Sequence, residues 1–367
     1  MSHYRTIWTF AILIISVGLV ALYSASHDNV RVSRQVFYDQ LACAALGLTL
    51  MYYLSRVSYR FFFDTAYILY AVNVILLFVV LVAGRSALGA TRWFNIFGFS
   101  FQPSELSKLA VILMLARYFS TRNPRLSFSF RSSLNILNRD LLLPLFLTLL
   151  SFGLIFKQPD LGSAILVFGI FIVMLFASGI EMKPFLVFIG CCIAAVPVGW
   201  HFLKDYQKDR LLVFLNPNID PLGAGYTIIQ SRIAVGSGQL FGKGWLAGTQ
   251  NQLNFLPERH TDFIFPVIGE EWGFLGAIFL LGCYFALILT GLQIAQQTRD
   301  RFGHLAAIGI VSILTLQMVI NMSMTMGLSP VVGITLPMVS YGRTSFIVFM
   351  AMLGMLLNMS ARRNVGH

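Results

Sequence analysis

Ten apolar segments, each near the length needed to cross a bilayer, constrain this chain more than any other feature. A helix needs about 20 residues to span the ~30 Å hydrocarbon core. The chain of 367 residues is 57% hydrophobic and 11% charged, whereas a soluble domain carries about 25% charged residues. We therefore predict an all-α polytopic membrane protein with about ten transmembrane helices, at about 7–24, 36–54, 67–83, 105–119, 141–157, 161–179, 184–203, 264–295, 304–326 and 337–359.

The basic residues predict how this bundle is oriented, because lysine and arginine concentrate in short cytoplasmic loops. The gap 117–139 holds five arginines and no acid, and alternate gaps hold Arg56, Arg60, Lys183, Arg299, Arg301, Arg362 and Arg363. The opposite gaps hold a smaller set: Arg31, Arg34, Arg85, Arg92 and Lys157. We expect both termini in the cytoplasm. The placement of these residues between apolar segments also argues against nucleic-acid binding, despite the net charge of +11.

One long connection, at about 204–262, is not apolar enough to span, and this orientation makes it extracytoplasmic. Its apolar anchors predict an ordered loop rather than a disordered one. Its glycine-rich stretch 236–244 lacks the G-K-[ST] ending of a nucleotide-binding loop. Exposed backbone N–H groups could still hold an anion together with Lys243, Arg232 and Arg210. A well-turned surface loop without a ligand is the alternative.

The most informative acid is Asp262, at the end of this loop. Glu258, Arg259 and His260 crowd the same turn, and Glu270 and Glu271 follow inside the apolar run, although the whole chain holds only 15 acidic residues. Charged groups beside hydrocarbon are costly and usually functional. Asp262 is a candidate general base, a ligand for Mg²⁺ or Mn²⁺, or simply a helix N-cap. His260 either tunes Asp262 or faces water.

A second group of polar residues begins the helix predicted at 105–119. Pro103 and Ser104 predict the helix start, with Ser104 as the N-cap. Glu105 and Lys108 are three residues apart and share one helix face. At the edge of a membrane both charges lose water, which favours a functional role. An ordinary ion pair at a helix end is the alternative.

Five other polar residues each have a structural interpretation. Asp160 resembles a helix N-cap, and the alternative is an acid that binds a cation or a substrate hydroxyl at the outer surface. Four further residues lie within apolar runs, where interhelical hydrogen bonding is the expected use: Asp39, Asn73, Gln317 and Asn321.

Four strings in this order resemble the signature segments of the SEDS family (shape, elongation, division and sporulation): Gln102-Pro-Ser-Glu-Leu-Ser-Lys, Gln158-Pro-Asp-Leu-Gly-Ser-Ala, Gln230-Ser-Arg-Ile-Ala-Val-Gly-Ser-Gly and Phe255-Leu-Pro-Glu-Arg-His-Thr-Asp-Phe-Ile-Phe. The similarity covers essentially the whole chain and is closest to the RodA-like elongation branch. It implies a single SEDS-type transmembrane domain over 1–367. It also implies that Asp262 matches an essential acid, Glu105 and Lys108 a functional pair, and Asp160 the acid of the Gln-Pro-Asp turn.

The resemblance implies a peptidoglycan glycosyltransferase of the bacterial inner membrane, with its active site outside the cytoplasm. Such an enzyme polymerises lipid II during cell elongation, together with a class B penicillin-binding protein (a transpeptidase) and other elongation-complex proteins. Transfer to a sugar 4-hydroxyl with inversion needs one base and no covalent intermediate. Asp262 is the candidate base, and Glu258 and His260 are supporting residues. Lys108, Arg210, Lys243 or a divalent cation would stabilise the departing undecaprenyl pyrophosphate.

Two other functional classes stay open. A lipid II flippase or transporter would also need ten helices with polar groups inside, but its polar groups would lie near the midplane, and the chain lacks inverted halves. A scaffold would not need the crowded acids. One residue departs from the family pattern, which usually reads Tyr-Gly-Gly near the last helix. This chain has Arg343 at the second glycine, so either the local packing differs or the chain is an altered variant.

Overall fold

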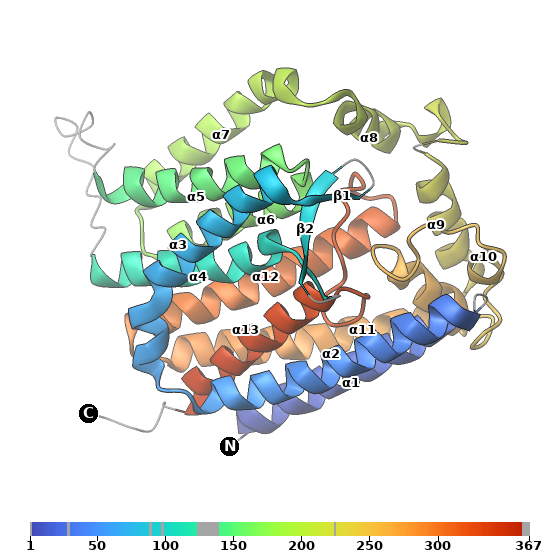
Figure 1. Ribbon diagram of the computed structural model, residues 1–367, viewed down its shortest axis with the longest axis horizontal. Helices are drawn as coiled ribbons and strands as arrows, with labels where there is room; N and C mark the ends of the chain where they lie inside the picture. Colours follow the sequence, from blue (N-terminus) through green and yellow to red (C-terminus); the bar gives the residue numbers. More distant parts are fainter. Residues whose placement is uncertain are drawn as a thin grey trace. The chain divides into compact units, whose positions relative to one another are not determined.

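The computed structural model describes residues 2–27, 30–87, 90–96, 99–122, 139–223 and 225–361. Helices make up most of the described chain (Figure 1). In order they are α1 (Ser2–Ala25), α2 (Val30–Arg56), α3 (Tyr59–Ala83), α4 (Pro103–Thr121), α5 (Arg139–Lys157), α6 (Leu161–Ala177), α7 (Met182–Phe202), α8 (Asp205–Leu215), α9 (Tyr226–Ser237), α10 (Thr249–Gln252), α11 (Ile264–Gln297), α12 (Arg301–Thr325) and α13 (Arg343–Ala361).

Each of the ten predicted apolar segments coincides with a helix of this series. Within the described residues, six helices are long and apolar enough to span a membrane: α1, α3, α7, α11, α12 and α13. The apolar helices at Leu141–Lys157 and Leu161–Ala177 are shorter. The chain is therefore a multi-pass helical membrane protein. The basic segment 123–138 and the pair Arg362 and Arg363, on which much of the predicted orientation rests, lie outside the described residues.

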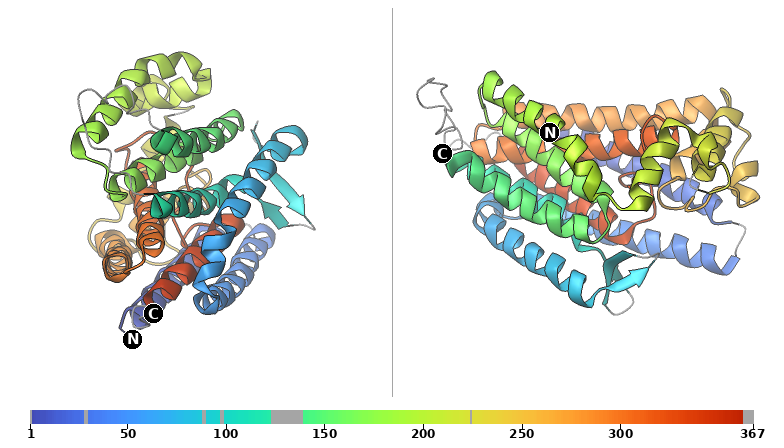
Figure 2. Two further views of the ribbon diagram at one scale, coloured as in Figure 1. Left: turned by 90° about the vertical axis from the view of Figure 1, so that its left-hand side faces the viewer. Right: turned by 90° about the horizontal axis from the view of Figure 1, so that it is seen from above.

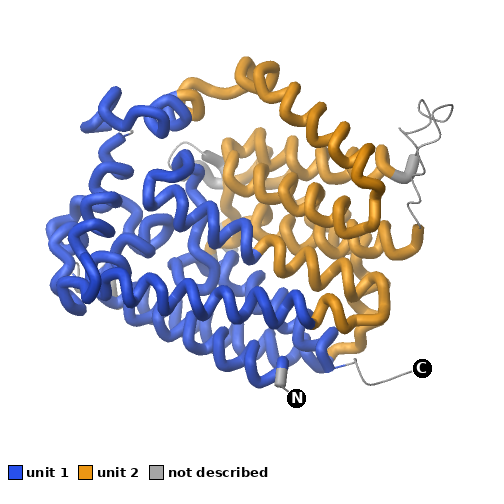
Figure 3. Tube along the Cα trace, turned by 180° about the vertical axis from the view of Figure 1, so that it is seen from behind, with its two compact units in different colours: residues 1–56, 209–293, 314–364 blue, residues 57–208, 294–313, 365–367 orange. Residues whose placement is uncertain are grey.

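The described residues form two compact units, coloured separately in Figure 3. Unit 1 comprises 1–56, 209–293 and 314–364, and unit 2 comprises 57–208, 294–313 and 365–367. Helices α8, α11 and α12 each contribute residues to both units. The expectation of a single domain over 1–367 stays a prediction.

Unit 1 is built around α1, α2 and α13, which contact one another and lie side by side in Figures 1 and 2. The amide of Asn358 on α13 donates to the carbonyls of Leu54 at 3.1 Å and Ser55 at 3.2 Å at the end of α2. Most of α13 is buried, as expected for a helix that other helices surround. The last helix starts at Arg343 rather than near 337, because Gly333 and Met338 have positive φ and Pro337 lies between them. We call 328–342 the irregular segment.

Unit 2 contains α3 to α7 and a small sheet that the sequence analysis did not predict. In it α4 packs against α3 and α6, and α5 packs against α6. The sheet order is β1 (Arg85–Ala87), β2 (Ala90–Ile96) and β3 (Phe99–Phe101), antiparallel throughout, with Phe94 opposite Phe101. Aromatic residues and threonine in β2 favour a pleated surface. The most apolar window of α7 contains no buried residue, which is consistent with a lipid-facing helix.

The loop 204–262 is ordered over its described residues, as predicted, and it meets a break in the run expected at 264–295. Gly273 breaks the helical geometry of α11 with a φ of 65°. Backbone N–H groups of Lys243 and Gly244 donate to the carbonyls of Glu270 at 2.9 Å and Glu271 at 3.0 Å. The loop thus satisfies carbonyls that the break releases, which an apolar environment requires. It also contains α8, α9, α10 and a 3₁₀ turn, η2 (Pro217–Ile219).

Glycine is required where the loop meets this break. A Cβ atom on Gly242 would lie 2.1 Å from the Glu271 carbonyl oxygen, and one on Gly273 would lie 2.3 Å from the Gly242 nitrogen. Both atoms belong to the backbone and cannot move aside as a side chain can. The close approach of loop and helix therefore depends on the absence of side chains at these two positions.

Candidate functional site

Asp262 lies in unit 1, half-buried, two residues before α11 begins. Asn321 on α12 donates from its amide to the Asp262 carbonyl at 2.9 Å and to the Ile334 carbonyl at 2.6 Å. A Cβ atom on Gly333 would lie 3.4 Å from Oδ2 of Asp262. One buried amide therefore fixes the backbone of Asp262 against the irregular segment, and Gly333 lies beside its carboxylate.

His260 is half-buried and contacts the other end of the irregular segment. The Tyr341 N–H donates to the His260 carbonyl at 2.8 Å, and the two ring centroids are 6.2 Å apart. Burial lowers the pKa of His260, the nearby Glu258 carboxylate raises it, and Arg259 lowers it further. The neutral imidazole is therefore favoured in the folded protein. A role for His260 in tuning Asp262 stays a prediction.

Glu258 shapes the turn that leads to Asp262. It is exposed and has a φ of 51°. Its carbonyl accepts from the N–H groups of Thr261 at 3.1 Å and Phe263 at 3.3 Å. The Thr261 hydroxyl also donates to Glu258 Oε2 at 3.3 Å. These bonds fold the chain tightly over 258–263, so Glu258 helps to present Asp262.

Arg210 contacts the same irregular segment as Asp262. Its Nη1 donates to the Val331 carbonyl at 3.3 Å, two residues before Gly333. The structure thus associates one of the candidate cations with the segment that borders the Asp262 carboxylate. Binding of an anion by Arg210 stays a prediction.

Lys243 already has a carboxylate partner. Its Nζ donates to Glu270 Oε1 at 2.7 Å and to the Thr249 hydroxyl at 2.8 Å. Glu271 accepts from the Ser24 hydroxyl of α1, and the Asn251 amide also contacts it at 3.5 Å. Glu270 and Glu271 therefore hold the loop 243–251 against α11 and α1. From the sequence they were grouped with the acids around Asp262, but in the structure they have these structural contacts. Lys243 was expected to bind an anion, but the Glu270 carboxylate already neutralises its positive charge.

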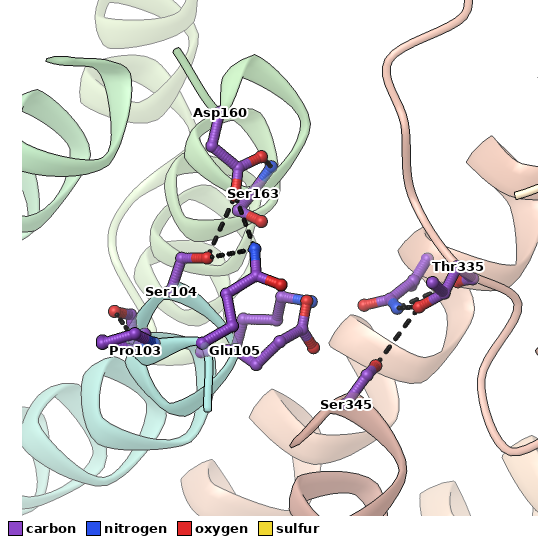
Figure 4. Close-up of polar contacts among 11 residues, drawn as sticks. Pro103, Ser104, Glu105, Asp160, Ser163, Thr335 and Ser345 are labelled. Atoms are coloured by element: carbon purple, nitrogen blue, oxygen red, sulfur yellow. Dashed lines mark hydrogen bonds and ion pairs between the residues drawn. The ribbon is translucent and has the colours of Figure 1, made fainter. Parts of the chain in front are cut away.

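In unit 2, Glu105, which is labelled in Figure 4, forms a buried ion pair with Lys108. Lys108 Nζ donates to Glu105 Oε1 at 2.7 Å, and the two side chains are 1% and 10% exposed for Lys108 and Glu105. The second oxygen, Oε2 of Glu105, is buried and has no hydrogen-bond partner among the described residues. Buried polar atoms are usually hydrogen-bonded, so this oxygen is available to a donor from a bound molecule. The burial of both side chains also distinguishes the pair from an ordinary ion pair at an exposed helix end.

Asp160 caps α6, as predicted, and also joins it to α4. Its carboxylate accepts from the Ser163 N–H at 3.2 Å, the Ser104 hydroxyl at 3.0 Å and the Gln102 amide at 3.1 Å (Figure 4). The prediction of Ser104 as the N-cap of α4 was wrong. The N-cap is Gln102, and Ser104 lies inside the first turn, where its hydroxyl bonds to Asp160 instead.

A model of the cell cycle protein family FtsW/RodA/SpoVE matches residues 4–365. The chain belongs to this family. The predicted SEDS membership is therefore confirmed over nearly the whole sequence.

Relatives and solved structures agree with this assignment. The chain is 39% identical over 355 residues to the peptidoglycan glycosyltransferase MrdB of Escherichia coli K12, covering 94% of this chain and 90% of that one. It resembles the rod shape determining protein RodA of Thermus thermophilus, with a TM-score of 0.71, 32% identity, and coverage of 98% and 97%. It also resembles a chain of a peptidoglycan synthase complex, with a TM-score of 0.81, 34% identity, and the same coverage. The predicted enzyme class, a peptidoglycan glycosyltransferase, is confirmed at this level.

The described residues contain no group of three or more His, Cys, Asp or Glu side chains arranged to hold a metal. Mg²⁺ is often bound by one or two carboxylates together with substrate phosphates, so a single Asp262 carboxylate fits a cation shared with a substrate. Tyr341 and Gly333 were not predicted as neighbours of the turn that carries His260 and Asp262. Asn321 was expected only to form interhelical hydrogen bonds, as a polar residue in an apolar run. Its position in that run was the sequence signal that pointed to this contact with Asp262.

Proposed function

We propose that this chain polymerises lipid II into glycan strands during cell elongation, with Asp262 as the general base. One observation carries the proposal: the half-buried Asp262 is held by Asn321 beside the irregular segment, which Arg210 also contacts. A carboxylate can take the proton of a hydroxyl as a general base, and an arginine suits a pyrophosphate. The likeness to RodA supports the elongation role.

The reaction we propose is one inverting displacement. The 4-hydroxyl oxygen of the acceptor sugar attacks the anomeric carbon of the donor, and the bond from that carbon to the pyrophosphate oxygen breaks. Asp262 takes the hydroxyl proton, and undecaprenyl pyrophosphate leaves with the electron pair. A single base is sufficient for inversion. Arg210 would stabilise the charge that develops on the leaving group.

In unit 2, we propose that one buried carboxylate binds substrate. Oε2 of Glu105 offers an acceptor for a substrate hydroxyl or amide, while Lys108 neutralises the carboxylate. Asp160 would keep the start of α4 in place through Ser104 and Gln102. If Mg²⁺ or Mn²⁺ binds, the Asp262 carboxylate would hold it, and the cation would supply further positive charge for the leaving group.

We also propose that the protein lies in the bacterial inner membrane with both termini in the cytoplasm and Asp262 outside it. The basic loops support this orientation. The partner would be a class B penicillin-binding protein within an elongation complex. This proposal is supported by the similarity to a chain of a peptidoglycan synthase complex that coordinates polymerization and crosslinking.

Incubation of purified protein with labelled lipid II, with Mn²⁺ and with a chelator, tests this function. Glycan polymer formed in detergent is the expected product. If sealed vesicles show lipid II crossing the bilayer while detergent samples yield no polymer, the protein is a flippase and the proposal fails. Restoration of rod shape in cells depleted of their own elongation polymerase tests the elongation role separately.

A further inference from the structure

Asp39 on α2 and Arg343 at the start of α13 form an ion pair within unit 1. We infer that this pair is a positioning device for the turn that carries His260 and Asp262. The inference deepens the proposed function and rests on it. It also gives a use to Arg343, the residue at which the sequence departs from the pattern of the family.

The Tyr341 hydroxyl contacts both members of the pair. The Arg343 Nε donates to the Tyr341 hydroxyl at 3.1 Å, and that hydroxyl lies 3.5 Å from Asp39 Oδ2. The Arg343 Nη2 bonds directly to the same carboxylate oxygen. The side chains are 19% exposed for Arg343 and 30% exposed for Asp39. Because both are partly withdrawn from water, their attraction is screened less than that of a surface pair.

The residues around Tyr341 also contact the turn that carries His260 and Asp262. While the Tyr341 side chain lies on the ion pair, its backbone N–H donates to the His260 carbonyl at 2.8 Å. Next to Asp39, the Gln40 amide reaches the Ser340 carbonyl at 3.4 Å. Two consecutive residues of α2 therefore fix 340–343, and this stretch fixes His260, two residues before Asp262.

Electrostatics at the start of α13 explain why the pair needs both members. A positive side chain at a helix N-terminus is unfavourable, because the exposed N–H groups there carry partial positive charge. The first turn of α13 contains no acidic residue. Asp39 supplies negative charge from a neighbouring helix, and this charge offsets the unfavourable position of Arg343.

A simpler reading is that Asp39 only neutralises Arg343. The two readings differ when both charges are removed together. If Asp39 only neutralises, the double variant Asp39→Asn with Arg343→Met polymerises like the wild type. If the pair positions the turn, that variant stays impaired, and exchange of the charges through Asp39→Arg with Arg343→Asp restores the link.

The test measures polymerisation of labelled lipid II by both single variants, the neutral double variant and the charge-exchanged variant. We expect kcat to fall about tenfold in the first three, with KM changed less than about twofold, and to recover in the exchanged variant. A neutral double variant with the wild-type kcat would overturn the inference, as would an exchanged variant no better than the neutral one. Asp205→Asn, at an exposed pair with 3.9 Å between Lys208 Nζ and Asp205 Oδ1, is the control and should leave kcat unchanged.

Hydrogen exchange at the Tyr341 amide provides a readout that does not depend on activity. This N–H should exchange faster in Asp39→Asn and Arg343→Met than in the wild type, and should be protected again in the charge-exchanged variant. Unchanged protection in both single variants would overturn the inference even if their activity fell. If the wild type makes no polymer, the proposed function fails, whereas the exchange measurement still decides whether the pair holds this stretch.

Discussion

The amide of Asn321 donates to the backbone carbonyl of Asp262 at 2.9 Å. The same amide donates to the Ile334 carbonyl, so Asn321→Leu leaves two carbonyls without this donor. Small displacements of a reacting group are costly, and we expect kcat to fall about 10- to 100-fold. Lipid II polymerisation by the purified variant, normalised to folded protein, measures the effect.

Asn358→Leu is the matched control, because this buried amide also donates to two backbone carbonyls of unit 1, those of Leu54 and Ser55. Each variant should lower the thermal midpoint. Only Asn321→Leu should lower the turnover of the molecules that stay folded. Equal turnover in the two variants would show that Asn321 is a packing residue and does not position Asp262.

The buried pair of Glu105 and Lys108 gives a second prediction. Removing one charge alone, in Lys108→Met, should destabilise the protein by about 3–5 kcal/mol, because an uncompensated buried charge remains. Adding Glu105→Gln should recover much of that stability but not activity, if the carboxylate contacts substrate. Lys108→Arg keeps the charge but changes its geometry, and should still lower activity.

Thermal midpoints and polymerisation rates of these variants distinguish the two roles of the pair. Full activity in Lys108→Arg, or in the neutral double variant, would assign Glu105 and Lys108 to structure alone.

His260 predicts how stability depends on pH. Its pKa in the folded protein lies below the ordinary value of 6.5, chiefly because of burial, so the unfolded chain binds more protons as the pH falls. The stability from the neutral imidazole is therefore fully present above pH 6.5 and is lost as the pH falls toward the folded-state pKa. Glu258, Arg259 and Tyr341 are the neighbouring groups.

Thermal midpoints of the wild type and His260→Gln across this range test the prediction. The wild-type curve should drop more steeply below pH 6.5 than that of the variant. Parallel curves would mean that His260 contributes nothing to the acid sensitivity of folding.

Glycine at the break in α11 gives a prediction with an internal control. Gly242→Ala places a Cβ atom 2.1 Å from the Glu271 carbonyl oxygen and should strongly destabilise the loop on α11. A Cβ atom on Gly282, in the same helix, meets nothing within 4 Å. Gly282→Ala should be neutral or slightly stabilising, since alanine favours a helix by about 1 kcal/mol over glycine. Equal thermal midpoints for the two variants would contradict the account of this contact.

The helices were predictable because a bilayer demands long apolar segments and satisfied backbone groups. The ten predicted apolar segments each coincide with a helix, whereas the short helices α8, α9 and α10 of the loop 204–262 were not predicted. The break at Gly273 was not predicted. The N–H groups that satisfy the released carbonyls belong to Lys243 and Gly244, which lie far from the break in the sequence. The strands β1 to β3 were missed for a related reason: short strands before α4 carry little hydrophobic signal beside long apolar helices.

The site was predictable in its chemistry but not in its contacts. The sequence identified Asp262 and the pair Glu105 and Lys108 as unusual charges. It could not show that Lys243 bonds to Glu270, or that Ser104 bonds to Asp160 instead of capping α4. Such partners depend on which helices meet. Arg343 illustrates the same limit, because its partner Asp39 lies on the second helix of the chain.

The most direct test of the central claim is polymerisation by purified Asp262→Asn. Asparagine keeps the size of the side chain and the backbone bond to Asn321, but it cannot accept the hydroxyl proton. We predict a folded protein with the wild-type thermal midpoint and a rate of glycan synthesis from labelled lipid II lowered about 100-fold or more. Glycan synthesis at the wild-type rate would show that Asp262 is not the base.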